Sequence, residues 1–227
     1  MTEKAIIFDS GALISFSMNG ITDIIRDLKK IFNGKFLITI PIKGEIIDRP
    51  LKIKRFSLEA LKLKQLVDEK VLEMPSSLGI SDDEILNRTN KILDTVNSSF
   101  EGKGKPLHIL DLGEASGLAL SSILFKKKIQ NVIVVDERTT RVLIENPDNL
   151  KRFLEKKLHV GVRIKNNLNE FKKYGVIRSA ELIYVAYKKG ILKFRGKGVL
   201  DAMLYAVKFK GAAISGEEIQ EMERLAV

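Results

Sequence analysis

The chain has 227 residues, of which 44% are hydrophobic and 30% charged, and its formal net charge is +10. This composition supports a sizeable core and excludes wholesale disorder. No stretch approaches the roughly 20 apolar residues that cross a bilayer, and no secretory signal is visible. Because cysteine is absent, disulfides, thiolate zinc sites and a cysteine nucleophile are excluded. We therefore expect a cytoplasmic protein without membrane association.

The positive charge favours a polyanionic partner, with RNA or DNA as the first candidate. A solubilising surface explains the same charge equally well.

Strand and helix patterns alternate along the first two thirds of the chain. Strands are expected at residues 4–8, 36–40 and 131–135, with weaker candidates at 71–74 and 159–164. Helices are expected after Ser10 as a cap, at 20–32, from Pro41, at 57–69, after Ser81, at 112–127 and after Asp136. Residues 98–106 read as a mobile Gly/Lys loop, and from 166 the pattern is helical, at 166–173, 178–189, 198–209 and 216–225.

This alternation predicts an α/β fold with a central, mostly parallel sheet flanked by helices. We expect one domain over residues 1–165 and a helical C-terminal extension over 166–227 that packs on it.

Two acids occupy equivalent positions directly after apolar strands. Asp9 follows the run from Ala5 to Phe8, and Asp136 follows the run from Val132 to Val135. In a parallel sheet the carboxyl ends of the strands share one edge, where ligand sites form. Each acid alone is more simply a helix N-cap, but their equivalence favours a shared site.

Three further acids lie near helix starts. Glu45 follows the second strand, where the helix dipole or water could also account for it. Asp111 and Glu114 are spaced to share one helical face, or to form a cap with its reciprocal partner. Gly113 and Gly117 beside them could leave room around the acids or allow tight packing of the helix on the sheet.

Four or five carboxylates in one cleft repel one another. At an effective dielectric of about 20, two unit charges 4 Å apart cost roughly 4 kcal/mol. Such a cluster persists if acids are protonated or a cation binds, and oxygen-rich sites select Mg²⁺ or Mn²⁺. Such an ion activates water and neutralises charge on a phosphate. The acids and the positive charge together suggest hydrolysis of nucleic acid.

Four stretches in order, "IIFDSGALI", "IPIKGEII", "LDLGEASGLALS" and "VIVVDERTTR", resemble the PIN-domain nucleases, which include VapC-type toxins and ribosome-processing enzymes. The resemblance spans residues 4 to about 144. It implies a parallel sheet, Mg²⁺ or Mn²⁺ and hydrolysis of RNA phosphodiester bonds by a metal-dependent endoribonuclease. The acidic quartet falls on Asp9, Glu45, Glu114 and Asp136, with Asp111 as an additional metal ligand.

The resemblance also matches Ser10 to a small hydroxyl residue of the family, and we assign Ser10 and Thr139 to the orientation of water or phosphate. Residues 198–222 resemble tails of some archaeal PIN proteins, without an implied role. An antitoxin or another protein partner and a homodimer are further expectations. The choice between a toxin and a processing enzyme stays open.

A basic segment over residues 49–64 follows Glu45 directly. Lys52, Lys54 and Arg55 in it are candidates for gripping RNA phosphates, and a solvated face is an equal alternative.

Two other readings compete with the nuclease. One is a PIN-like protein that binds RNA or a partner without cutting. The other is a haloacid-dehalogenase-like phosphatase, which needs a second acid where this chain has Gly11.

Overall fold

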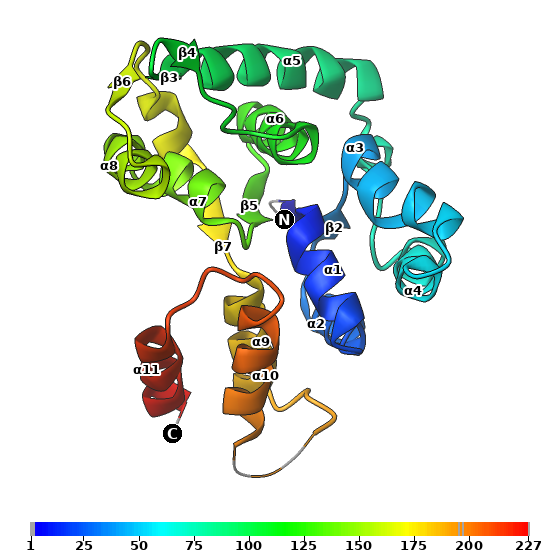
Figure 1. Ribbon diagram of the computed structural model, residues 1–227. Helices are drawn as coiled ribbons and strands as arrows, with labels where there is room; N and C mark the ends of the chain where they lie inside the picture. Colours follow the sequence, from blue (N-terminus) through cyan, green and yellow to red (C-terminus); the bar gives the residue numbers. More distant parts are fainter. Residues whose placement is uncertain (1–2, 195, 197, 227) are drawn as a thin grey trace.

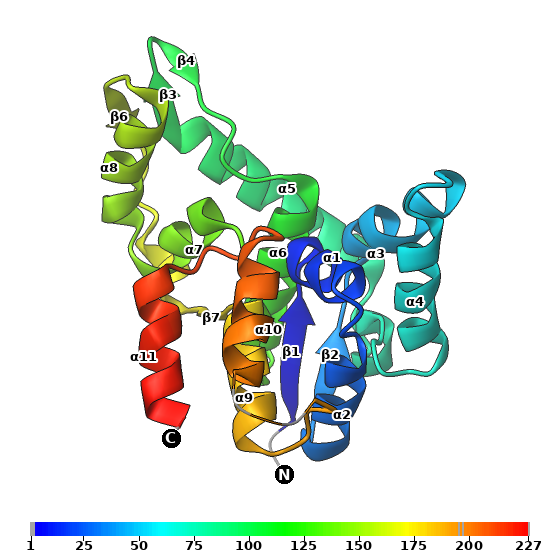
Figure 2. The same ribbon diagram turned by 60° about the horizontal axis from the view of Figure 1, so that its bottom comes forward.

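A parallel four-stranded sheet lies at the centre of the protein. The computed structural model describes residues 3–194, 196 and 198–226. The strand order is β2-β1-β5-β7, and the strands are β2 (Lys35–Leu37), β1 (Lys4–Phe8), β5 (Gln130–Val134) and β7 (Gly175–Ile177). All three pairings are parallel, and Figure 2 shows β1 and β2 pointing the same way. Their carboxyl ends therefore meet at one edge, as the sequence predicted.

Helices cover both faces of this sheet, because alternate residues of each strand point to opposite sides. Ile6 and Phe8 belong to one buried cluster and Ala5 and Ile7 to the other. The first cluster contains residues of α1 (Ser10–Met18), α2 (Asp23–Ile31), α4 (Ser57–Asp68), α9 (Ser179–Lys188) and α10 (Val199–Lys208). The second contains residues of α5 (Asp82–Ser99), α6 (Leu112–Lys126), α7 (Arg138–Glu145) and α8 (Pro147–Leu158).

The chain between β2 and α4 is irregular. A short helix, α3 (Ile40–Lys43), has Pro41 in its first turn, where proline is tolerated. It runs into a π-helical turn at Gly44–Asp48 and a 3₁₀ turn at Pro50–Lys52. A further 3₁₀ turn, Pro75–Leu78, precedes α5. The candidate strand at 71–74 is reduced to a single bridge between Leu37 and Glu73.

The predicted mobile loop at 98–106 is wrong. Residues 98 and 99 end α5, and residues 100–106 form a hairpin of β3 (Phe100–Gly102) and β4 (Lys105–Pro106). β3 also pairs with β6 (Val162–Ile164) in a separate three-stranded sheet. Gly104 at the turn has a φ of +73°, which favours glycine. The Gly/Lys composition marks a hairpin turn here, and Phe100 anchors it in the core.

The prediction that the chain is helical from residue 166 onward missed one strand. Residues 169–173 form a 3₁₀ turn, and β7 follows as an edge strand paired to β5. Three residues are too few to show a period of two, so β7 left no sequence signal. The remaining helices are α9, α10 and α11 (Gly216–Ala226). Figure 1 shows them grouped below the sheet.

No helix in the described part of the chain combines the length and apolar character that crossing a membrane requires.

Candidate functional site at the carboxyl edge of the sheet

Asp9 and Asp136 lie where β1 and β5 end, and each keeps one carboxylate oxygen without a partner. Asp9 Oδ2 accepts a 3.3 Å hydrogen bond from the Gly11 N–H, so Asp9, not Ser10, caps α1. Asp136 Oδ1 accepts from the Ser179 N–H at 2.8 Å. The other oxygens, Asp9 Oδ1 and Asp136 Oδ2, are buried and have no hydrogen-bond partner among the residues that the structure describes. The two residues are 6% and 3% exposed, and buried polar atoms of this kind normally have partners.

Burial and the charges of neighbouring acids raise the pKa values of these carboxyl groups. Burial is the main cause that raises the pKa of Asp9 from 3.8 to about 6, and the charges of Glu45 and Asp136 raise it further. Burial likewise raises the pKa of Glu114 to about 7, with a contribution from the charge of Asp9. Burial also raises the pKa of Asp136. Asp9 is thus within electrostatic reach of the other three acids of the predicted quartet.

Glu45 comes from the π-helical turn that follows β2, where Arg49 N donates to Gly44 O five residues back. Its carboxylate lies against the backbone of α6. A Cβ atom added to Gly113 would stand 2.9 Å from both Glu45 carboxylate oxygens. Gly113 therefore leaves room for an acid, whereas Gly117 faces ordinary contacts with Ile7 and Ile133 at 3.9 Å.

A buried hydroxyl pair joins the helices that carry Glu45 and Glu114. Ser116 Oγ donates to Gly113 O at 2.6 Å and lies 2.6 Å from Thr39 Oγ1. Because a serine hydroxyl has one proton, Thr39 is the donor in the second bond. Thr39 occupies the N-cap position of α3, so its bond to Ser116 fixes the start of that helix to the second turn of α6.

Glu114 is held by two donors. Its Oε1 accepts from Thr140 Oγ1 at 2.6 Å, and its Oε2 accepts from the Asp111 N–H at 2.9 Å. The second bond is the reciprocal half of a capping box, so the cap reading of this pair is confirmed and Asp111 is the N-cap of α6.

The Asp111 side chain differs from the buried acids in its exposure to solvent. It is 76% exposed and its Oδ1 lies 2.7 Å from His108 Nε2. Asp111, His108 and Glu114 line a cavity of about 380 Å³ together with Glu137 and Thr139. The cavity opens beside Glu114, so it brings solvent to one of the four acids.

Ser10 and Thr139, assigned to water or phosphate, lie on either side of the edge. Ser10 is the first, half-buried residue of α1. Thr139 is buried, and its Oγ1 donates to Glu137 Oε1 at 2.8 Å. This bond uses the hydroxyl proton of Thr139, so the hydroxyl oxygen can still accept a hydrogen bond but has no second proton to donate.

Sequence reasoning missed Glu137, Thr140 and Ser179. Glu137 caps α7 by accepting from the Thr140 N–H at 2.8 Å, and its charge raises the pKa of Glu114. Glutamate is not among the residues preferred at an N-cap, so no capping pattern identifies it. Ser179 contacts Asp136 from 43 residues away, which no local pattern reveals.

The C-terminal segment also fixes Asp136 from its backbone side. The Ala213 N–H donates to Asp136 O at 3.1 Å, and Ala213 O accepts from Arg141 and Arg178. Arg178 is 8% exposed and pairs with Glu181 and Glu218. Residues after 166 therefore contribute to the position of this acid.

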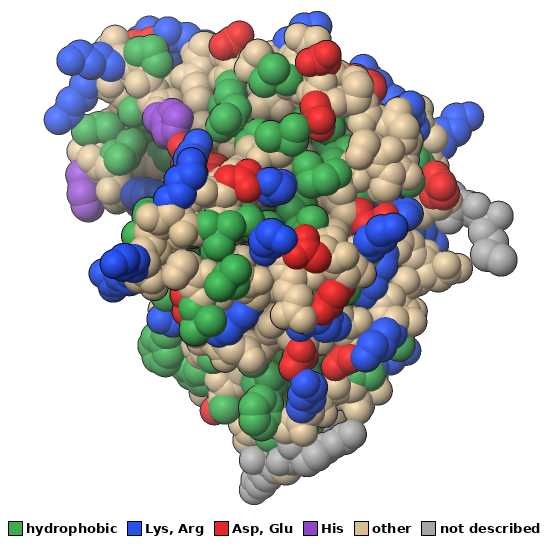
Figure 3. Space-filling view, turned by 90° about the vertical axis from the view of Figure 1, so that its right-hand side faces the viewer, with side chains coloured by type: hydrophobic (Ala, Val, Ile, Leu, Met, Phe, Trp, Pro, Cys, Tyr) green, Lys and Arg blue, Asp and Glu red, His purple; other side chains and the backbone are tan. Residues whose placement is uncertain are grey.

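The basic candidates Lys52, Lys54 and Arg55 are all exposed. Within the described residues none of them forms an ion pair, and Arg55 lies 5.4 Å from the centroid of the Phe56 ring. Figure 3 shows that the side of the molecule carrying α3 and α4 mixes Lys and Arg with Asp and Glu. These three cations are free to meet a phosphate, although no uniformly basic surface surrounds them.

The residues brought together here suit the binding of a hard cation in one respect and not in another. Two buried carboxylate oxygens lack partners, which fits a cation. Across the residues that the structure describes, however, no three Asp, Glu or His side chains form a ready-made metal shell. Comparisons with family models, with curated proteins and with solved structures give no match to this chain.

Proposed function

We propose that this protein is a metal-dependent endoribonuclease whose Mg²⁺ or Mn²⁺ is held by Asp9, Glu45, Glu114 and Asp136. The observation that carries the proposal is the pair of buried, unpartnered oxygens, Asp9 Oδ1 and Asp136 Oδ2, at two neighbouring strand ends. A buried carboxylate without a partner is costly, and a divalent cation supplies the missing charge. The resemblance to PIN-domain nucleases supports the same residues.

Each acid has a distinct part in this site. Asp9 and Asp136 offer their free oxygens to the cation, and Ser179 holds Asp136 by its other oxygen. Glu45 reaches the site over Gly113, and Thr140 orients Glu114. The bound cation supplies a Lewis acid that activates water and stabilises phosphate charge. Lys52, Lys54 and Arg55 steer the RNA backbone.

The experiment that tests the proposal is cleavage of RNA with Mn²⁺ by Asp9→Asn. Asparagine keeps the cap on α1 but loses the charge, so we expect at least a 100-fold loss of rate. Asp94→Asn changes an exposed acid of α5 and serves as the matched control with normal rate. Unchanged cleavage by purified Asp9→Asn refutes the assignment.

A non-cutting PIN-like protein that binds RNA or a partner is the second candidate. It is favoured by the hydrogen bonds that already occupy both oxygens of Glu114 and by the lack of a ready-made metal shell among the described residues. Saturable RNA binding by the wild-type protein, with no cleavage in Mn²⁺ or Mg²⁺, selects this candidate over the nuclease.

A further inference from the structure

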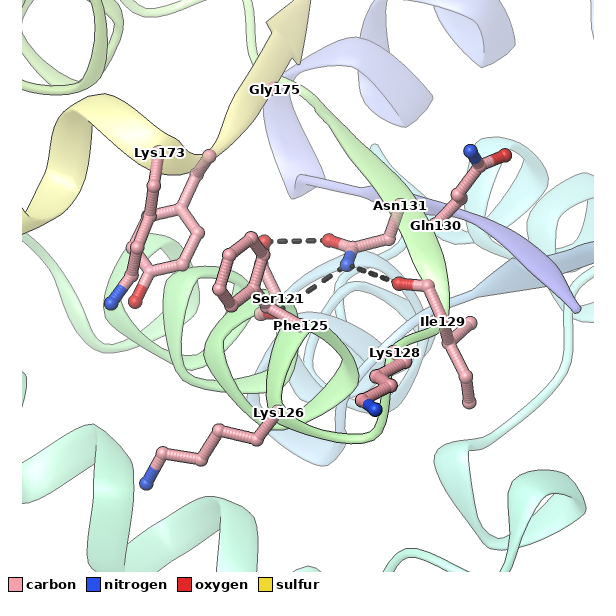
Figure 4. A pocket seen from close by; sticks show the side chains of 10 residues that line it. Ser121, Phe125, Lys126, Lys128, Ile129, Gln130, Asn131, Lys173 and Gly175 are labelled. Carbon is pink, nitrogen blue, oxygen red and sulfur yellow. Dashed lines mark hydrogen bonds between the residues drawn. The ribbon is translucent and has the colours of Figure 1, made fainter. Parts of the chain in front are cut away.

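A cavity of about 780 Å³ lies at the amino edge of the sheet, where β5 and β7 begin. Figure 4 shows its walls, which come from the end of α6, the start of β5 and the residues before β7. Gln130 begins β5, and Asp136 follows the last residue of β5 by two positions. Six residues of strand span about 20 Å, so this cavity is separate from the acidic edge.

Two aromatic rings form part of the cavity wall. Phe125 and Tyr174 meet edge to face, with ring centroids 6.5 Å apart and an interplanar angle of 88°. The Phe125 side of this pair is open, because the residue is 51% exposed. An exposed aromatic face of this kind can stack against the base of a nucleotide.

Lysines dominate the polar part of the lining. Lys126, Lys128 and Lys173 line the cavity, and none of the other described residues that line it is acidic. In the described chain none of the three forms an ion pair, and Lys173 instead lies over the Phe125 and Tyr174 rings at 5.5 and 5.2 Å. Three unpaired ammonium groups around an apolar floor are complementary to an anion with an aromatic body.

The Tyr174 hydroxyl adds a donor without a partner. Tyr174 is 6% exposed, and its buried hydroxyl oxygen forms no hydrogen bond with any described residue. The neighbouring amide of Asn131 differs, because Ser121 Oγ donates to Asn131 Oδ1 at 2.6 Å and Asn131 Nδ2 donates to Ile129 O at 3.0 Å. Asn131 therefore shapes the wall, whereas the Tyr174 hydroxyl still has its proton to donate.

We propose that this cavity binds a nucleotide, with the base stacked on Phe125 and the phosphate held by Lys126, Lys128, Lys173 and the Tyr174 hydroxyl. Its volume suits a ligand of this size. The nucleotide is either free or part of an RNA strand. The inference goes beyond the proposed nuclease and does not depend on it, because no residue is shared between the two sites.

Binding of two probes tests the inference, both in EDTA so that no cleavage interferes. The probes are AMP and a 2′-O-methyl oligoadenylate of 12 nucleotides, titrated calorimetrically. We expect saturable binding of at least one probe and at least a fivefold loss of affinity in Phe125→Ala and in Lys173→Gln. Tyr174→Phe keeps the ring and should weaken binding about threefold. Lys91→Gln, an exposed lysine of α5, should bind as the wild type does.

The outcomes separate the sources of the nucleotide. Tighter binding of AMP supports a free nucleotide, and tighter binding of the oligonucleotide supports a strand. Adenosine should bind at least fivefold more weakly than AMP, since it lacks the phosphate. The inference is overturned if neither probe binds saturably, if Phe125→Ala and Lys173→Gln bind as the wild type does, or if Lys91→Gln weakens binding equally. Thermal unfolding of each variant checks that it is folded.

Discussion

The two ends of the central sheet carry opposite charges in opposite settings. At the carboxyl end, Asp9 and Asp136 are buried and their free oxygens have no partner. At the amino end, Lys126, Lys128 and Lys173 surround an open cavity. An unpaired charge therefore costs more free energy where water is excluded. A buried carboxylate costs stability until something neutralises it, whereas an exposed ammonium group is already stabilised by water.

Removal of Arg178, a buried cation near Asp136, should have a large effect on stability. Arg178 is charge-paired with Glu181 and Glu218 and bonds Ala213 O. In Arg178→Met we expect a loss of about 3 kcal/mol in the free energy of unfolding, because Ala213 O and two partly exposed carboxylates lose their donor. Urea unfolding measures it. Arg152→Met, at an exposed site of α8, should change little, and equal effects of the two would show that the charge network contributes nothing.

Asp9→Asn should stabilise the metal-free protein above neutral pH. The folded chain binds the Asp9 proton more tightly, with a pKa of about 6 against the ordinary 3.8. The free energy of unfolding therefore falls as pH rises from about 4 to about 6 and stays low above that range. At ~1.36 kcal/mol per pKa unit, ionised Asp9 costs about 3 kcal/mol.

Urea unfolding of both proteins in EDTA at pH 3.5 and pH 8 measures this effect. Asp9→Asn should exceed the wild type by about 3 kcal/mol at pH 8 and match it at pH 3.5. A difference that is the same at both pH values argues against a buried charge at Asp9.

Two glycines of α6 have different neighbours: Gly113 leaves room for Glu45, and Gly117 packs against the sheet. Gly113→Ala pushes the Glu45 carboxylate aside, since a Cβ there stands 2.9 Å from its oxygens. Alanine favours the helix by up to about 1 kcal/mol, so we expect an equal or higher melting temperature together with at least a tenfold slower cleavage of RNA. Gly117→Ala meets only ordinary contacts and should keep full cleavage. Equal rates in both variants contradict the role of Glu45.

The smallest effect is expected at the amino end. Combined Lys126→Gln, Lys128→Gln and Lys173→Gln should change the free energy of unfolding by less than about 0.5 kcal/mol, because these groups are exposed and unpaired in the described structure. Urea unfolding at pH 8 measures it. A loss comparable to that of Arg178→Met would mean that charged groups contribute equally to stability at the two ends of the sheet.

Sequence patterns predicted the parts of the fold that rest on local periodicity. The strands at 4–8 and 131–135 are found as β1 and β5, and the capping signal of Ser81 correctly marks the start of α5. Both strands end on an acid, and parallel strands place their carboxyl ends at one edge, so the proximity of Asp9 and Asp136 followed from topology.

The remaining features depend on contacts that no local pattern reports. β7 has three residues and is recognisable as a strand by its pairing to β5. The hydrogen bond from the Ser179 N–H to Asp136 joins residues 43 positions apart. Gly113 leaves room for Glu45 only because the π-helical turn places the Glu45 side chain beside it. Sequence composition does not reveal that placement.

Diffraction from a crystal soaked in Mn²⁺ tests the central claim most directly. The account predicts an anomalous peak at the carboxyl edge, within about 2.5 Å of Asp9 Oδ1 and Asp136 Oδ2, with Glu45 or Glu114 moved in to complete the shell. A well-occupied peak elsewhere, or none at this edge while both oxygens remain unpartnered, would contradict it.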